Sequence, residues 1–579
     1  MRRLLGLTIG SLALAASAAL WAPSAKAQVA CLPGSDVFCL DQGSKWTNAT
    51  RKAFYSTDQG SQLMPYAWLK ALKTPDGQPF LFDKLARFGY LPDPFRADLP
   101  IGFTTSANTS KVWVGMTCAA CHTRQIARGG FQFRVDGGPA ISDFRALLSD
   151  LLDAVNVVRT DDTAFAAFAK SVLGAWASNS AKAKLKEDVE LWYLRENTMR
   201  ERAYPTADIW GLGRLDAVAM IFNRLTGLDL GPPPSYLIPD NIKPADAPVR
   251  YPFLWNAAIQ DKTQWPGFAG NGTALLGLAR NTGEVYGVFA TFHPAEDFFK
   301  IGNINYNANN SANWPGLRAV EELIKKIGAP KWPAQFPIIT ALIPRGEEVY
   351  KANCASCHNL APPKAGEPGF PNVPTWATPV QDVGTDSREY DILKREADPG
   401  VLAKTSSRLF PKLQVTNPSP AFDLLKYSVI GSILQSWSFA PALVTDFRDS
   451  HWTFKTVGID KAKDLLEDAI TLQDTGNQIK YESRVMFGIW AAAPYLHNGS
   501  VPTLWDLLQP ADQRPATFKV GPEFDPLKIG VAADQPGSYT RTTTGCEDRN
   551  SGNSRCGHEF GTNLPIDDKR ALIEFMKTQ

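Results

Sequence analysis

The spacing of apolar residues predicts helices in several parts of the chain. Residues 143–158 (DFRALLSDLLDAVNVV) and 214–225 (RLDAVAMIFNRL) carry apolar side chains at intervals of three and four, the spacing of one helix face. A proline and two aspartates open the segment 565–579, whose apolar residues also fall on one stripe. Such stretches outnumber clear strands. The pattern therefore predicts a mainly α protein with little β structure.

The length and composition of the chain predict that it is divided into two domains. The chain has 579 residues, more than one hydrophobic core usually supports, so two domains are expected. The proline-rich stretch 328–337 (GAPKWPAQFP) predicts a hinge between an N-terminal domain, 28–335, and a C-terminal domain, 336–579. The N-terminal domain is expected to begin with a cap that extends to about residue 110. The 43 prolines and 44 glycines predict long loops. The formal charge is +2 without a basic tract, which argues against nucleic acid as a partner.

The first 27 residues have the features of a secretory signal peptide. Arg2 and Arg3 precede an Ala/Leu-rich core, and Ala25-Lys26-Ala27 forms a small-x-small cleavage site. An uncleaved membrane anchor is the alternative, because the apolar run is nearly long enough to span a bilayer. Ser, Thr and Gly inside the run favour cleavage. We therefore expect a mature protein that is periplasmic or secreted and has no transmembrane segment.

The eight cysteines fall into two kinds of pattern. Four form close pairs around glycine-containing turns, Cys31 with Cys39 and Cys546 with Cys556. An exported chain meets an oxidising compartment, so both pairs are expected to form local disulfides. The other four belong to two Cys-x-x-Cys-His units, and no cysteine is left over.

In a Cys-x-x-Cys-His unit, two thiols add to the vinyl groups of haem and the adjacent histidine binds its iron from one face. The units consist of Cys118, Cys121 and His122 in VGMTCAACHTRQ, and of Cys354, Cys357 and His358 in YKANCASCHNL. A zinc site would need two more Cys or His ligands nearby at regular spacing, which neither unit has. A thioredoxin-like redox pair would leave both histidines unexplained. The sequence thus predicts two covalently bound haem c groups, each with its iron.

A helix is expected to lead into the second unit. In IPRGEEVYKANCASCH it begins after Pro344, with Val349 and Tyr350 ahead of the haem cysteines. A helix that carries the haem cysteines and packs against a C-terminal helix such as 565–579 resembles the arrangement of cytochrome c domains. This resemblance completes the expected fold class, which is mainly α with two cytochrome c-type haem domains, long loops and little β structure.

Further segments resemble the bacterial diheme cytochrome c peroxidase superfamily. APYLHNGSVPTLWDLL at 493–508 is similar to the PYxHxGSxxTL segment of these peroxidases. Residues 251–289 keep the family's order of Trp-x-Gly, a short apolar stretch, Asn and Glu. With FYSTDQGSQLMPYAWLKAL at 54–72 and CGHEFG at 556–561, the pattern most resembles the larger branch that contains the diheme rubber oxygenase and the diheme fatty-acid dioxygenases.

The resemblance implies that the two haem groups have different tasks. Peroxide or dioxygen would react at the haem of the first unit, while the haem of the second unit would be six-coordinate and handle electrons. The leading prediction is a periplasmic oxidoreductase that reduces peroxide, with a small c-type cytochrome or a cupredoxin as electron donor. Two alternatives stay open. One is a dioxygenase acting on an olefin such as polyisoprene or an unsaturated fatty acid; the other is a non-catalytic diheme electron carrier.

The sixth ligand of the second iron is expected late in the chain. The rubber-oxygenase relatives have two histidine ligands at this haem, which implies His558 in CGHEFG. A disulfide ending at Cys556 would stabilise this loop by up to ~3 kcal/mol. Related enzymes use Met or Tyr from a segment before PYxH, so the alternatives here are Tyr481 and Met486. The resemblance places His497, within PYLHNGS, near a haem edge.

Two residues are expected to complete the first site. Glu284 matches the distal acid of the peroxidases in order and approximate spacing, and a carboxylate there can take a proton from bound peroxide and return it. Burial should raise its pKa, while an ion pair with Arg280, four residues earlier, is the structural alternative. Trp265 corresponds to the tryptophan that relays electrons between the haem groups, with ordinary core packing as the alternative.

The lining of the first site bears on the choice between peroxidase and oxygenase. His293, nine residues after Glu284, is a further candidate for the same face. In the rubber oxygenase this pocket is apolar and has no acid. Here the region offers Glu284 together with five aromatic residues, Trp255, Phe268, Phe289, Phe292 and Phe298.

Overall fold

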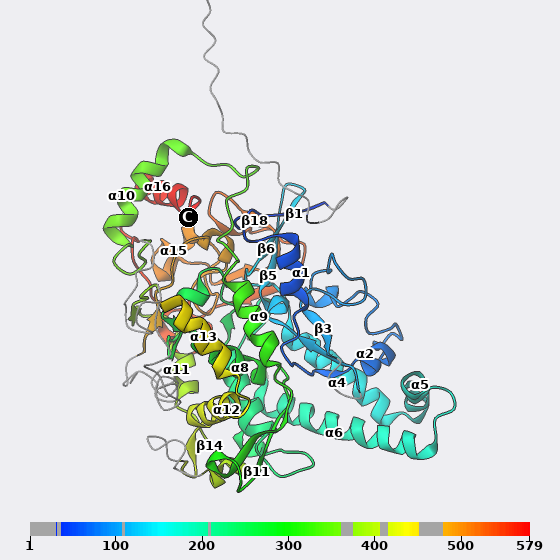
Figure 1. Cartoon of the computed structure of the whole chain (residues 1–579). Helices are drawn as coiled ribbons and strands as arrows, with labels where there is room; N and C mark the ends of the chain where they lie inside the picture. Colours follow the sequence, from blue (N-terminus) through cyan, green and yellow to red (C-terminus); the bar gives the residue numbers. More distant parts are fainter. Residues whose placement is uncertain are drawn as a thin grey trace, which may run out of the picture.

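The computed structural model describes residues 31, 36–106, 111–205, 210–360, 375–405, 415–450 and 479–579. Helices dominate this part of the chain, and long loops join them (Figure 1). The α-helices are α1 Asn48–Ser56, α2 Tyr66–Ala71, α3 Cys118–Cys121, α4 Phe144–Thr160, α5 Asp162–Leu173, α6 Asn179–Ala203, α7 Ala217–Phe222, α8 Ala274–Gly287, α9 Trp314–Ile324, α10 Ile343–Asn353, α11 Arg388–Leu393, α12 Ala421–Gln435, α13 Phe439–Ser450, α15 Leu504–Leu507 and α16 Ile566–Met576. The predicted signal peptide, 1–27, lies outside the described residues.

The strands are short and pair mostly two by two. One three-stranded sheet has the order β1-β6-β5, in which β1 is parallel to β6, and another has the order β2-β4-β3. Their strands are β1 Val37–Cys39, β2 Met64–Pro65, β3 Phe103–Ser106, β4 Trp113–Met116, β5 Thr123–Arg128 and β6 Phe131–Asp136. The two-stranded ladders are β7 Arg214–Leu215 with β8 Val249–Arg250, β9 Lys262–Thr263 with β10 Ala269–Gly270, β11 Phe292–Glu296 with β12 Ile304–Asn310, β13 Val380–Gln381 with β16 Tyr481–Glu482, β14 Glu396–Ala397 with β15 Ser419–Pro420, β17 Thr517–Lys519 with β20 Thr540–Thr542, and β18 Phe524–Asp525 with β19 Gly530–Val531. The mainly α expectation is consistent with this inventory.

The predicted helices are present. Residues 143–158 fall on α4, where the Asp143 side chain accepts the Ala146 N–H at 2.9 Å and so fixes the helix start. Residues 214–225 contain α7, which continues into a π-helical turn at Asn223–Leu228. The helix expected after Pro344 is α10.

The helices α10 and α16 pack side by side (Figure 1). The ring centres of Tyr350 and Phe575 lie 5.3 Å apart at their interface, and Arg345 forms a 2.8 Å ion pair with Asp568. Gly346 permits this close approach, because a Cβ atom there would lie 2.0 Å from the carbonyl oxygen of Ala571. The pairing of these two helices agrees with the arrangement expected from the cytochrome c resemblance.

The buried apolar side chains form two clusters. The larger one surrounds α4, α7, α8 and α12, and the smaller one joins the N-terminal sheet to α9, α10 and α16. Both clusters contain residues from either side of position 335, and the predicted division of the chain at that point stays a prediction.

Both predicted disulfides are present, Cys31–Cys39 and Cys546–Cys556. In the described part of the chain, no helix combines the length and the apolar character needed to cross a membrane.

Candidate functional site

The first Cys-x-x-Cys-His unit lies on a single short helix, α3, directly after β4. The Thr117 side chain accepts the Ala119 N–H at 3.3 Å and starts the turn, and the His122 N–H closes it on the Cys118 carbonyl at 2.9 Å. Both thiols of the unit are free. They line, together with His122, a cavity of about 1360 Å³, which we call the first cavity.

The imidazole of His122 has the orientation and the protonation state of a metal ligand. Its Nδ1 lies 2.7 Å from the carbonyl oxygen of Pro252, so Nδ1 carries the proton and donates it. This leaves the lone pair on Nε2, and a histidine ligand usually has such a carbonyl acceptor on its other nitrogen. Burial lowers the pKa of His122 to about 4, which keeps the ring neutral at neutral pH.

The second unit follows α10 and repeats this arrangement. The His358 N–H donates to the Cys354 carbonyl at 2.9 Å, and His358 Nδ1 donates to the Arg484 carbonyl at 2.8 Å. Cys354 and His358 line a second cavity of about 1040 Å³, which α16 closes on one side with Leu572, Ile573 and Met576. The donor set and space at both units fit covalently bound haem.

The predicted sixth ligand, His558, lies in the second cavity opposite His358. The centres of the two imidazole rings are 6.2 Å apart. An imidazole nitrogen binds a metal ion at about 2.0–2.1 Å, so two imidazoles on opposite sides of one ion have ring centres roughly 6 Å apart. Burial lowers the pKa of His558 to about 3, so this ring is also neutral. Its Nδ1 is buried without a hydrogen-bond partner in the described part of the chain.

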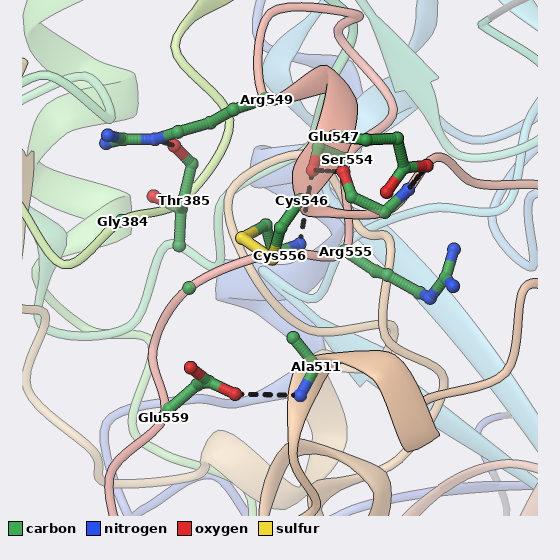
Figure 2. Close-up of a disulfide and its surroundings, with 12 residues drawn as sticks. Gly384, Thr385, Ala511, Cys546, Glu547, Arg549, Ser554, Arg555, Cys556 and Glu559 are labelled. Atoms are coloured by element: carbon green, nitrogen blue, oxygen red, sulfur yellow. Dashed lines mark hydrogen bonds between the residues drawn. A yellow bond between two sulfur atoms is a disulfide. The ribbon is translucent and has the colours of Figure 1, made fainter.

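The loop that presents His558 is held at several points. The disulfide Cys546–Cys556 closes it just upstream, and the Glu559 carboxylate accepts the Ala511 N–H at 2.9 Å (Figure 2). Arg514 Nη1 donates to the carbonyls of Arg555 and Gly557, both at 2.7 Å. Position 557 requires glycine, because φ is +78° and a Cβ atom would lie 2.2 Å from the Gly384 carbonyl carbon. The histidine therefore sits on a rigid support.

The alternative ligands also reach the second cavity. Tyr481, Met486 and His497 all line it, and the rings of Tyr481 and His497 stack at 3.9 Å. The structure thus brings all four candidates together around His358, and the choice of His558 stays a prediction that the ring distance favours.

Trp265 lies in the wall that the two cavities share. Its Nε1 donates to the Arg250 carbonyl at 3.2 Å, and the guanidinium carbons of Arg250 and Arg484 lie 4.6 Å and 4.7 Å from its ring centre. Its predicted role as an electron relay between two haem groups stays a prediction. Neither arginine could be predicted from the sequence, because both stand outside the recognised motifs and nothing in their spacing marks them.

Glu284 projects from α8 into the first cavity. Gln264 Nε2 donates to its Oε1 at 3.2 Å, and burial raises the pKa of its carboxyl group. The alternative ion pair with Arg280 is not present in the described structure, since Arg280 pairs with Glu321. Glu284 is therefore a half-buried acid whose carboxylate accepts a hydrogen bond from an amide.

Other expectations about the lining of the first cavity were wrong. His293 lies on β11, stacked on Tyr236 at 3.7 Å and 3.4 Å from Asp229, and it does not line the first cavity. Phe298 is 82% exposed, and of the five aromatic residues only Phe268 lines a neighbouring cavity beside Glu284. The lining combines aliphatic side chains with other aromatic ones; the aliphatic residues include Leu215, Met220, Ile221, Val249, Val285 and Val288, and the aromatic residues are Phe144, Tyr251, Phe253 and Trp265. The apolar stripe predicted at 214–225 was the signal that could have identified part of it.

Comparison with known proteins places two segments of this chain among c-type cytochromes. Residues 480–519 match the family model described as RoxA-like, cytochrome c-like. Residues 341–393, which include α10 and the second unit, match the model described as cytochrome c oxidase, cbb3-type, subunit III. These matches support covalently bound haem c and a role in haem-based redox chemistry or electron transfer.

Two similar proteins come from Sinorhizobium fredii. The chain is 29% identical to the uncharacterized protein y4iJ over 602 residues, which cover 92% of each chain. It is 28% identical to the uncharacterized protein y4iM over 280 residues, 44% of this chain and 52% of the relative. The similarity to y4iJ therefore extends through nearly the whole chain.

Proposed function

We propose that this chain is an exported oxidoreductase with two haem c groups that reduces a peroxide at the first one. Cys118 and Cys121 would hold the reacting haem with His122 as its iron ligand, and electrons would enter through the haem at Cys354, Cys357 and His358. The observation that carries the proposal is the difference between the cavities. Among the described residues that line it, the first contains the half-buried carboxyl group of Glu284 and no histidine besides His122, whereas the second contains His558, whose ring centre lies 6.2 Å from that of His358.

The residues around the first cavity suit proton transfer to a small peroxide. Haem iron supplies the electrons that cleave an oxygen–oxygen bond. Glu284 would accept a proton from the entering peroxide at a carboxylate oxygen and return it to the departing oxygen. Gln264 holds that carboxylate by its 3.2 Å hydrogen bond, and the aliphatic walls limit the access of water. Trp265, in the shared wall, would relay electrons between the two haem groups.

The experiment that tests this proposal measures the oxidation of a reduced small c-type cytochrome or cupredoxin by hydrogen peroxide. Replacing Glu284 by Gln keeps the shape and removes the proton acceptor, so turnover should fall by about 10²-fold or more. Glu196→Gln is the matched control, because Glu196 is a buried acid that pairs with Arg224 and lines neither cavity. Unchanged turnover in Glu284→Gln would remove this residue from the reaction.

A second candidate is oxygenation of an olefin by dioxygen. The match of residues 480–519 to the RoxA-like model and the largely apolar lining of the first cavity favour it. Oxygen uptake with an unsaturated substrate and no electron donor would be its signature. Turnover in that assay alone would replace the peroxidase proposal. A non-catalytic electron carrier would show two six-coordinate irons and no turnover in either assay.

A further inference from the structure

Arg250 and Arg484 form a buried pair of cations between the two cavities. Arg250 ends β8 and Arg484 follows β16. Their side chains line both cavities and are almost completely buried. Both guanidinium groups lie over the ring of Trp265, so two positive charges are close together in the apolar wall between the cavities.

The hydrogen bonding of this pair is incomplete. Arg250 Nε donates to the Leu496 carbonyl at 2.9 Å, but its Nη1 has no partner in the described structure. Arg484 Nε and Nη1 likewise have none, and Nη2 lies 3.3 Å from Glu482 Oε2. Within the described residues, Arg250 has no ion pair at all. Burial, with the charge of Arg484 as the next cause, lowers the pKa of Arg250 to about 9, so it stays charged at neutral pH.

Nearby carboxylates do not neutralise both charges. Glu482 is the acidic partner of Arg484, and its Oε1 already accepts from Gln260 Nε2 at 2.6 Å and Thr378 Oγ1 at 2.9 Å. An unpaired buried cation is strongly unfavourable, and an unsatisfied buried donor adds to the cost. The free N–H groups therefore indicate an anion that binds when the cavities are filled. Arginine is the residue best suited to a carboxylate, because its planar fork can donate two parallel hydrogen bonds.

We infer that Arg250 and Arg484 are a carboxylate clamp that binds the propionate groups of both haem groups at the wall the cavities share. The inference rests on the proposed presence of two haem groups and not on the reaction they perform. The clamp fixes the haem edges next to Trp265. Its positive charge, at the wall that both cavities share, would stabilise the reduced state of a haem bound in either cavity.

The test replaces each arginine by glutamine and measures the midpoint potential of both haem groups. Without the guanidinium, the negative propionate is no longer compensated, so both potentials should fall. We expect the equilibrium for electron uptake to change about tenfold or more, or about 59 mV for a one-electron couple. Arg→Lys variants at both positions keep the charge and lose the fork, so their potentials should fall less. Resonance Raman bands of the propionates should shift in both kinds of variant.

Arg541→Gln is the matched control, since Arg541 is buried, donates to the Gly499 carbonyl at 2.8 Å and lines neither cavity. Haem content is measured in every protein. Fewer than two haem groups in the unmodified chain would overturn the proposed function and the clamp together. Two haem groups with unchanged potentials and Raman bands would overturn the clamp alone, as would an equal shift in Arg541→Gln. If the glutamine variants do not accumulate, the Raman bands of the lysine variants decide.

Discussion

Removing the disulfide Cys546–Cys556 should loosen the proposed second haem site before the rest of the molecule unfolds. The two cysteines are 10 residues apart, and the chain-entropy relation gives a loss of about 2.7 kcal/mol for a loop of this length. Because 1.4 kcal/mol is a factor of ten, the closed form of the loop becomes about 100-fold less favoured. Arg514 still holds the carbonyls of Arg555 and Gly557, so the loop should remain closed without denaturant.

The chain contains a matched control for this prediction. Cys31 and Cys39 are 8 residues apart, so removing their disulfide costs about 2.5 kcal/mol by the same relation, at a place remote from His558 in the sequence. In each double Cys→Ser variant, guanidinium titrations would follow the low-spin signal of the second iron together with circular dichroism. In Cys546→Ser/Cys556→Ser the low-spin signal should be lost at lower denaturant than the helical signal. In the control and the unmodified protein the two should be lost together.

One result would refute this reasoning. If the two signals are lost together in all three proteins, then either the disulfide does not support the loop or His558 does not bind the iron. His558→Ala separates these explanations, because it removes the imidazole and leaves the disulfide in place.

Three further predictions follow from the described contacts. In His558→Ala the second iron should change from low-spin to high-spin in absorption and electron paramagnetic resonance spectra, whereas His497→Ala should leave it low-spin; the opposite pattern would move the ligand to His497. Gly346→Val should push α10 away from α16, because a Cβ atom there meets the Ala571 carbonyl at 2.0 Å, and should lower the free energy of unfolding by about 1–3 kcal/mol. Gly537→Ala, where nothing lies within 4 Å, should change it by less than about 0.5 kcal/mol in denaturant titrations. Peroxide turnover should rise with pH through the pKa of Glu284, because only the ionised carboxylate accepts a proton. Burial raises that pKa above its ordinary value of 4.5. The rise in turnover should be absent in Glu284→Gln, and a rise that persists there would be assigned to another group.

The local features of the fold could be predicted from the sequence. The apolar stripes gave α4, α7 and α16, and the close spacing of the cysteines gave both disulfides, because each of these depends on neighbouring residues. The Cys-x-x-Cys-His units likewise mark their own sites, since the thiols and the imidazole come from one turn.

Features that depend on distant segments were harder to predict. The carbonyls that orient His122 and His358 belong to Pro252 and Arg484, more than a hundred residues away, and a backbone acceptor leaves no signature in the sequence. His293 and Phe298 follow Glu284 closely, yet the chain leaves the cavity after α8 and carries them elsewhere. Closeness in sequence to Glu284 therefore did not predict which residues line the first cavity.

The packing of α16 also has a consequence for how the protein matures. The side chains of Leu572, Ile573 and Met576 on this helix close one side of the second cavity beside Cys354 and His358. In the proposed function, haem would therefore have to be attached to the second unit before α16 packs against α10, because the side chains of α16 line the space that the haem would occupy. The packing of these two helices would then be the closing step of cofactor assembly.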